Sequence, residues 1–115
     1  MMRRRKRSDR TIACDISAGV REAVKERDWN RCIWCGKYIK SPDLCHYISR
    51  GAGGLGIPQN LVCGCRDCHR EADQGVNTKE YKRKMKEYLM KLYPDWSEDK
   101  LRYKTDFQKF LEDRK

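Results

Sequence analysis

The sequence predicts a small α+β domain in which helices flank a short β-structured segment and a bound metal ion stabilises a limited core. Two C-x-x-C pairs, Cys32/Cys35 and Cys65/Cys68, provide the metal-binding chemistry. Residues of high β-propensity lie between these pairs, whereas helical periodicity lies mostly outside them. Only 38% of the 115 residues are hydrophobic and the mean hydropathy is −1.00, and a core this small needs additional stabilisation.

The chain divides into a basic segment and one domain. Residues 1–10 are rich in arginine and have almost nothing to bury, so we expect a flexible arm that becomes ordered on a polyanion. Residues 11–115 contain no internal repeat and no linker, which predicts a single domain with a helical tail. The domain begins with a helix, because Val20 and Val24 follow the candidate N-cap Ser17 at helical spacing.

The middle of the chain is expected to be β-structured. Residues of high β-propensity mixed with turn formers predict strands around 33–40 and 43–48. Four glycines together with Pro58 predict a loop over residues 49–58. A short strand over 60–64 follows this loop.

Helices fill the rest of the chain. Residues 66–74 predict a helix that stops near Gly75, and Asn77 with Glu80 has the capping-box spacing for a longer helix that Pro94 ends. The apolar stripe of this longer helix consists of Tyr81, Met85, Tyr88, Leu89 and Leu92. A separate basic stripe consists of Lys79, Lys82, Arg83 and Lys86. The expected anchors of the tail are Trp96, Leu101, Phe107 and Phe110.

The charge balance indicates an acidic partner. Lysine and arginine outnumber aspartate and glutamate by 27 to 17, and the net charge of +10 favours nucleic acid. A basic protein that is merely soluble would show the same balance. No apolar run is long enough for a membrane span, and "SDRTIACDI" lacks the apolar region of a signal peptide. We therefore expect an intracellular protein with reduced thiols, although "RRRKR" can also be interpreted as a nuclear address.

The two cysteine pairs predict a structural zinc site. Two residues between paired cysteines let both sulfur atoms reach one ion, and two such turns complete a tetrahedral Cys₄ site for Zn²⁺. Gly36 suits the tight backbone after the first pair. The alternatives are four ordinary thiols, or a pair formed by Cys63 and Cys65, whose C-x-C spacing fits less well. Cys14 and Cys63 are interpreted as small buried residues.

A second metal site is indicated on the helix that starts at the second cysteine pair. His69 directly follows Cys68, and Asp73 lies four residues later on the same helix face. A histidine and a carboxylate at this spacing can bind one divalent cation. The pair alone is equally compatible with a solvated helix face.

The order of four polar residues is more specific than any one of them. His46 is followed after 13 residues by Asn60, after 8 more by His69 and after 3 more by Asp73. With the zinc pairs and the glycine loop, this order resembles the HNH endonuclease family, whose members have the ββα-metal fold. The resemblance spans residues 17–76, and "LYPDWSEDKLRYK" is similar to the tail of small phage-encoded members.

The resemblance implies a role for each of these residues. His46, on the first strand, would be the general base that takes a proton from water, and Asn60, on the second strand, would hold His46 in position. His69 and Asp73 would bind a catalytic divalent metal, Mg²⁺ or Mn²⁺, with Zn²⁺ or Ni²⁺ as alternatives. Arg50 would clamp a phosphate oxygen at the glycine loop. The basic stripe that would contact DNA phosphates consists of Lys79, Lys82, Arg83 and Lys86.

One residue departs from the family pattern. Many members have a metal-binding Asp or His directly before the general base, where this chain has Cys45. Thiolate suits Mg²⁺ poorly, so Cys45 is interpreted as a buried bystander, with water or Asp43 completing the metal sphere. The alternative is a site that prefers softer metals.

The predicted function is a metal-dependent DNA endonuclease that hydrolyses phosphodiester bonds with a histidine-activated water. The alternative is a non-catalytic zinc module that binds DNA or RNA. The resemblance to phage-encoded members implies the cytoplasm of a bacterial host, with the phage terminase as a candidate partner and no membrane. One active site cuts one strand, so the sequence is compatible with a nicking monomer or with a dimer that cuts both strands.

Overall fold

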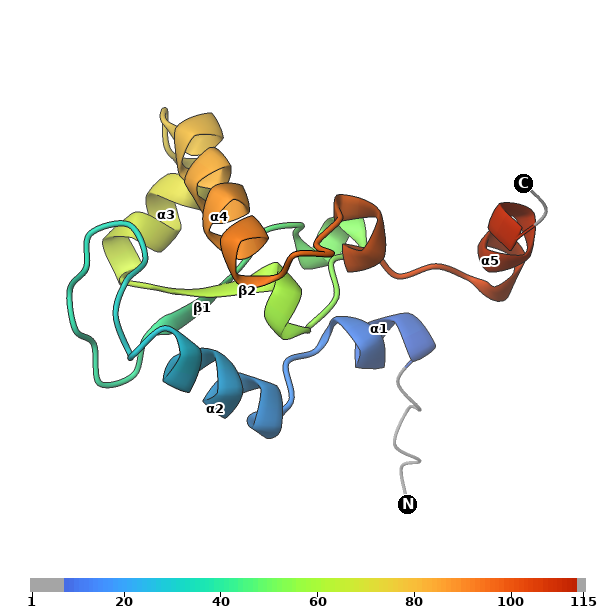
Figure 1. The fold of residues 1–115 in the computed structure, drawn as a ribbon, viewed down its shortest axis with the longest axis horizontal. Helices are drawn as coiled ribbons and strands as arrows, with labels where there is room; N and C mark the ends of the chain where they lie inside the picture. The colour runs from blue at the N-terminus through green and yellow to red at the C-terminus, as the bar shows by residue number, and fades with distance from the viewer. Residues whose placement is uncertain (1–7, 114–115) are drawn as a thin grey trace, which may run out of the picture.

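A two-stranded antiparallel sheet lies at the centre of the protein (Figure 1). The structure is a computed structural model and describes residues 8–113. Strand β1 spans Asp43–His46 and strand β2 spans Leu61–Gly64, in a register that sets Leu44 opposite Cys63. These two strands confirm the second and third of the three predicted β segments.

The first predicted β segment, residues 33–40, does not form a strand. Its only sheet-like feature is an isolated bridge between Arg31 and Tyr38. The backbone turns sharply between these residues, and Gly36 adopts a φ of +76°. The C-x-x-C pair requires a tight turn, and this requirement overrides the β-propensity of the neighbouring residues.

A separate apolar cluster packs on each face of the sheet, because successive residues of a strand point to opposite faces. Helix α2 (Ala18–Arg27) covers one face and helix α4 (Thr78–Leu92) covers the other. The α2 cluster consists of Val24, Leu44, Leu61 and Cys63. The α4 cluster consists of Cys45, Val62, Met85 and Leu89. The small core is therefore divided by a single pair of strands.

Helices α2 and α3 have the boundaries that the sequence predicts. Ser17 precedes α2, and its hydroxyl oxygen accepts a hydrogen bond from the Val20 backbone N–H at 3.1 Å. Helix α3 spans Arg66–Gln74 and ends before Gly75. Only the N-cap residue Cys65 separates the end of β2 from the start of α3, and β1 pairs with β2. The two strands and this helix therefore form a β-β-α unit.

Helix α4 starts without the predicted capping box. The Asn77 side chain makes no cap hydrogen bond, and the Glu80 carboxylate pairs with Arg83 instead of reaching back to Asn77. The Thr78 hydroxyl donates to the Gly75 carbonyl at 2.7 Å. The junction between α3 and α4 is therefore fixed by a residue inside the helix rather than by its N-cap.

Helix α1 (Asp9–Cys14) begins inside the segment predicted as a flexible arm. The Arg10 guanidinium donates to the Gly51 carbonyl at 2.9 Å, so this residue is attached to the loop before β2. The prediction for residues 1–7 lies outside the described part of the chain.

The tail is only partly packed. Trp96 donates from Nε1 to the Gln59 carbonyl at 2.7 Å, and Leu101 is buried, as expected. Phe107 and Phe110 are exposed, contrary to the prediction that they anchor the tail. They lie on helix α5 (Asp106–Asp113), which extends away from the body of the fold (Figure 1). No helix in residues 8–113 is both long enough and apolar enough to cross a membrane.

Candidate metal centre and histidine site

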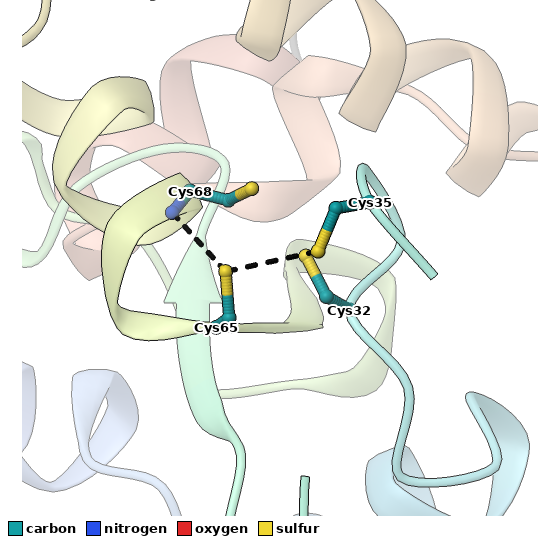
Figure 2. A group of neighbouring side chains, drawn as sticks. All are labelled: Cys32, Cys35, Cys65 and Cys68. Atoms are coloured by element: carbon teal, nitrogen blue, oxygen red, sulfur yellow. Dashed lines mark hydrogen bonds between the residues drawn. The ribbon is translucent and has the colours of Figure 1, made fainter. Parts of the chain in front are cut away.

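The four cysteines of the two C-x-x-C pairs lie together (Figure 2). The four sulfur atoms of Cys32, Cys35, Cys65 and Cys68 are all within 4.8 Å of one another. Zinc–sulfur bonds of about 2.3 Å in a tetrahedron place neighbouring sulfur atoms about 3.8 Å apart. The Cys35–Cys65 sulfur separation is 3.8 Å, so the donor set fits a zinc ion. No other group of three or more such ligands in residues 8–113 is this close together.

Local backbone geometry brings the sulfur atoms together. The Gly36 N–H donates to the Cys32 carbonyl at 2.8 Å, which closes the first turn. Cys65 is the N-cap of α3, and its sulfur accepts from the Cys68 backbone N–H at 3.3 Å. Burial raises the pKa of Cys32, but hydrogen bonds from backbone groups, including that of Trp34, outweigh this and bring the pKa to about 7. The first ligand is thereby poised to form the thiolate that binds a metal.

The remaining cysteines are small buried residues, as the sequence predicts. Cys14, Cys45 and Cys63 are all buried. Burial raises the pKa of Cys63 to about 12 and that of Cys45 still further. Cys45 is therefore a protonated thiol packed against α4, which supports its interpretation as a bystander rather than a metal ligand.

His46 is the last residue of β1 and has one unsatisfied nitrogen. Its ring is hydrogen-bonded to the backbone of Cys14, the last residue of α1. The Nε2 atom is buried and has no hydrogen-bond partner among the described residues. Burial lowers the pKa of His46, and the charges of Arg50 and Lys82 lower it further. The imidazole is therefore neutral near pH 7, with a free lone pair on Nε2.

His69 has a carboxylate at each ring nitrogen. Its Nδ1 lies 3.1 Å from Asp43 Oδ2, and its Nε2 lies 3.0 Å from Asp73 Oδ2. A neutral imidazole carries one N–H, so it can donate to only one of the two carboxylates. With Nδ1–H donating to Asp43, the lone pair on Nε2 faces Asp73, as in two ligands of one cation.

Asp43 is the residue that sequence reasoning placed least well. The sequence predicts Asp43 only as an alternative to water in the coordination sphere of the catalytic metal. In the structure it lies on β1, with its carboxylate next to Nδ1 of His69. The signal was the strand alternation, which places Asp43 and Cys45 on the face that α3 and α4 cover.

Asn60 braces the glycine loop, but from a different element than predicted. It ends the 3₁₀ turn Pro58–Asn60 just before β2, and it is completely buried. Its Oδ1 accepts from the Ile48 N–H at 2.8 Å, and its Nδ2 donates to the Leu55 carbonyl at 2.9 Å. The side chain therefore connects the backbone of Ile48, just before the loop, to that of Leu55 within it.

Two glycines of this loop, Gly54 and Gly56, serve internal packing. A Cβ on Gly54 would lie 1.7 Å from the Ile48 carbonyl oxygen, and one on Gly56 would lie 2.1 Å from the Asp15 carbonyl oxygen. Both glycines are buried. At these two positions the loop thus approaches the protein's own backbone.

Lys82 lies on the packed side of α4 rather than on an exposed basic stripe. It stands three and seven positions before Met85 and Leu89, so helical periodicity places it on their buried face. Its Nζ donates to the His46 carbonyl at 2.8 Å and lies 3.7 Å from Asp73 Oδ1, and burial lowers its pKa. Lys82 therefore fastens α4 to the end of β1.

Most of the other predicted phosphate-binding side chains are paired with carboxylates. The pairs are Arg83 with Glu80 and Glu87, Lys86 with Glu98, and Arg50 with Asp15. Lys79 is exposed, and its side chain forms no ion pair within residues 8–113. The stripe on α4 is therefore largely neutralised by neighbouring acidic groups.

Most of the predicted site residues around His46 share one cavity. This cavity has a volume of about 480 Å³, and His46, Arg50, His69, Asp73 and Lys82 all line it. Asn60 does not line this cavity, but its hydrogen bonds to Ile48 and Leu55 fix the loop. The structure thus brings together residues that are up to 36 positions apart in the sequence.

Comparison with known proteins gives a fold but no family. No protein-family model matches the chain, and no curated protein matches it. Its fold is similar to part of a solved structure, that of the type IV phosphorothioation-dependent restriction endonuclease ScoMcrA, with a TM-score of 0.56 and 23% sequence identity. The match covers 66% of this chain and only 17% of that chain. This small α+β fold is therefore similar to one part of a restriction endonuclease.

Proposed function

We propose that the protein is a metal-dependent DNA endonuclease of the HNH type, built on a ββα-metal unit formed by β1, β2 and α3. The observation that carries this proposal is the buried, unpartnered Nε2 of His46, a residue that lines the same cavity as His69 and Asp73. An unsatisfied buried nitrogen is rare in folded proteins, and a catalytic role is one of its few explanations. The fold similarity to a restriction endonuclease supports the same class of activity.

The cysteine cluster holds a structural zinc ion in this proposal, and the histidine site holds the catalytic divalent metal. His69 Nε2 and one Asp73 carboxylate oxygen are the protein ligands of that second ion, and Asp43 orients the ring through Nδ1. When bound, Mg²⁺ or Mn²⁺ supplies neutralisation of the charge on the scissile phosphate and the departing oxygen.

His46 acts as the general base. Its Nε2 lone pair takes a proton from water as the water oxygen forms a bond to phosphorus, and the bond from phosphorus to the 3′ oxygen breaks. Because its pKa is lowered, the ring is available in the neutral form that this step requires. Asn60 fixes the backbone after His46, and the Arg50 guanidinium reaches the same cavity as a phosphate contact.

The alternative is a zinc module that binds DNA or RNA without cutting it. The cysteine cluster and the net charge of +10 fit this alternative equally well. This alternative does not explain the unpartnered nitrogen of His46 or the two carboxylates next to His69.

A plasmid-nicking assay separates the two functions. Zinc-loaded protein should convert unmodified supercoiled plasmid to nicked product only when Mg²⁺ or Mn²⁺ is added. Asp73→Asn should abolish this conversion, whereas Asp67→Asn removes an exposed carboxylate from the same helix and should leave it intact. DNA binding without metal-dependent cleavage would instead identify the non-catalytic module.

A further inference from the structure

A second cavity opens on the other side of His69 and Asp73. It has a volume of about 680 Å³ and lies along β1 between α2 and α3. The cavity of the histidine site also has His69 and Asp73 in its wall. A strand of nucleic acid held in one cavity would therefore pass directly into the other.

Three arginines line this second cavity. Arg21 comes from α2, whereas Arg66 and Arg70 lie four positions apart on α3 and so share a helix face. They belong neither to the predicted arm nor to the basic stripe of α4. Two helices that are distant in the sequence thus direct positive charge into one hollow.

Two of these arginines have no acidic partner within residues 8–113. Arg66 lies 3.6 Å from Asp43 Oδ1, but no ion pair or side-chain hydrogen bond involves Arg21 or Arg70. Three of the predicted phosphate-binding cations on α4 differ, since Lys82, Arg83 and Lys86 are each beside a carboxylate. The arginine-lined cavity is therefore the more available site for an external anion.

The chemistry of the cavity selects phosphate groups. A guanidinium presents a planar set of donors that matches phosphate oxygens in a bidentate manner, and it stays charged at all accessible pH values. The acidic groups of the wall, Asp43 and Asp73, face His69, Arg66 and Lys82. The side of the cavity that Arg21 and Arg70 form is accordingly cationic.

We infer that Arg21, Arg66 and Arg70 form a phosphate subsite that holds the DNA backbone next to the phosphate being cut. The inference rests on the proposed function only for what happens at His46, because the subsite itself is a binding site. The subsite fixes where along the strand the reacting phosphate is placed.

Binding measured without added divalent metal tests the subsite separately from cleavage. The variant Arg21→Gln/Arg70→Gln should bind a fluorescent DNA duplex more weakly than the parent. Its log–log salt dependence should be flatter by roughly 0.9 for each phosphate that the protein no longer neutralises, thus about 1.8 for two phosphates. Each single variant should show about half of this change.

A charge-matched control is Lys91→Gln/Lys109→Gln, which removes two cations that line neither cavity. This control should keep the parent salt slope, and an equal flattening in it would overturn the subsite. Inorganic phosphate at matched ionic strength should not displace the duplex. Displacement that disappears in the arginine variant would show a site for free phosphate and overturn the assignment to a strand.

The outcomes distinguish this inference from the proposed nuclease activity. A parent that cuts plasmid, together with an arginine variant that keeps the parent salt slope, would refute the subsite alone. A parent that cuts no DNA, together with a flattened slope in the arginine variant, would refute the nuclease and support the subsite.

Discussion

The two ends of helix α3 carry two different kinds of site. At its start, Cys65 and Cys68 join Cys32 and Cys35 in a set of four ligands, which the protein supplies completely. Further along, His69 and Asp73 offer only two ligands and line a cavity. A closed set of four ligands is typical of structural zinc, whereas a catalytic metal needs positions left for water and substrate. One nine-residue helix thus connects the candidate zinc site to the site that we propose for catalysis.

Removal of one cysteine ligand should have the largest effect. Cys68→Ser should abolish zinc binding and unfold the domain, because structural zinc contributes roughly 10–16 kcal/mol and whole domains are stable by only about 5–15 kcal/mol. Zinc content and thermal unfolding followed by circular dichroism measure this. Cys14→Ala, which changes a buried cysteine outside the cluster, should retain its zinc. Chelated protein with an unchanged thermal midpoint would contradict the structural role.

Removal of the proposed base should affect chemistry alone. His46→Ala should lower the cleavage rate by roughly 10²–10⁴, the usual contribution of a general base. Zinc content and DNA affinity should remain at the parent values, since His46 contributes to neither metal site. A folded, zinc-loaded variant that nicks plasmid as fast as the parent would refute the assignment.

The contact between Asp43 and His69 should have a smaller effect. Asp43→Asn keeps the size of the side chain but weakens its hydrogen bond with His69 Nδ1. The affinity of His69 and Asp73 for the divalent metal should therefore fall by about 10–100-fold. The nicking rate measured against Mn²⁺ concentration should shift accordingly, with the parent rate restored at high metal. An unchanged titration curve would show that Asp43 does not orient the ligand.

The pH dependence should be the smallest effect. Burial lowers the pKa of His46 below its ordinary 6.5, so the neutral base persists to a lower pH than a free imidazole would allow. The cleavage rate at saturating metal should therefore be constant above pH 6.5 and should fall only as the pH drops through the lowered pKa. A rate that still rises steeply between pH 7 and 8 would argue against His46 as the titrating base.

The sequence predicted those parts of the fold that local patterns determine. Helix α3, strands β1 and β2 and the two cysteine pairs all follow from spacing within a few residues. Residues 33–40 were predicted wrongly because the demand of the four cysteines for a tight turn is a tertiary constraint. Phe107 has the pattern of a packed helix, but it is exposed on α5, which extends away from the body of the fold (Figure 1).

The candidate site was predicted in its members but not in its contacts. The order of His46, Asn60, His69 and Asp73 placed all four near one cavity, although their catalytic roles stay predictions. Lys82 was assigned to a separate basic stripe, although its spacing of three and seven residues from Met85 and Leu89 already places it beside the apolar stripe of α4, where it is half-buried.

The tight packing of Gly54 and Gly56 would complicate a mutational map of this protein. Because any side chain at either position would collide with backbone, alanine there should abolish activity as completely as alanine at His46. Neither glycine would need to touch DNA for this to happen. A mutational scan scored by activity alone would therefore assign these two glycines to the active site. A parallel scan of protein abundance would separate positions needed for folding from positions needed for catalysis.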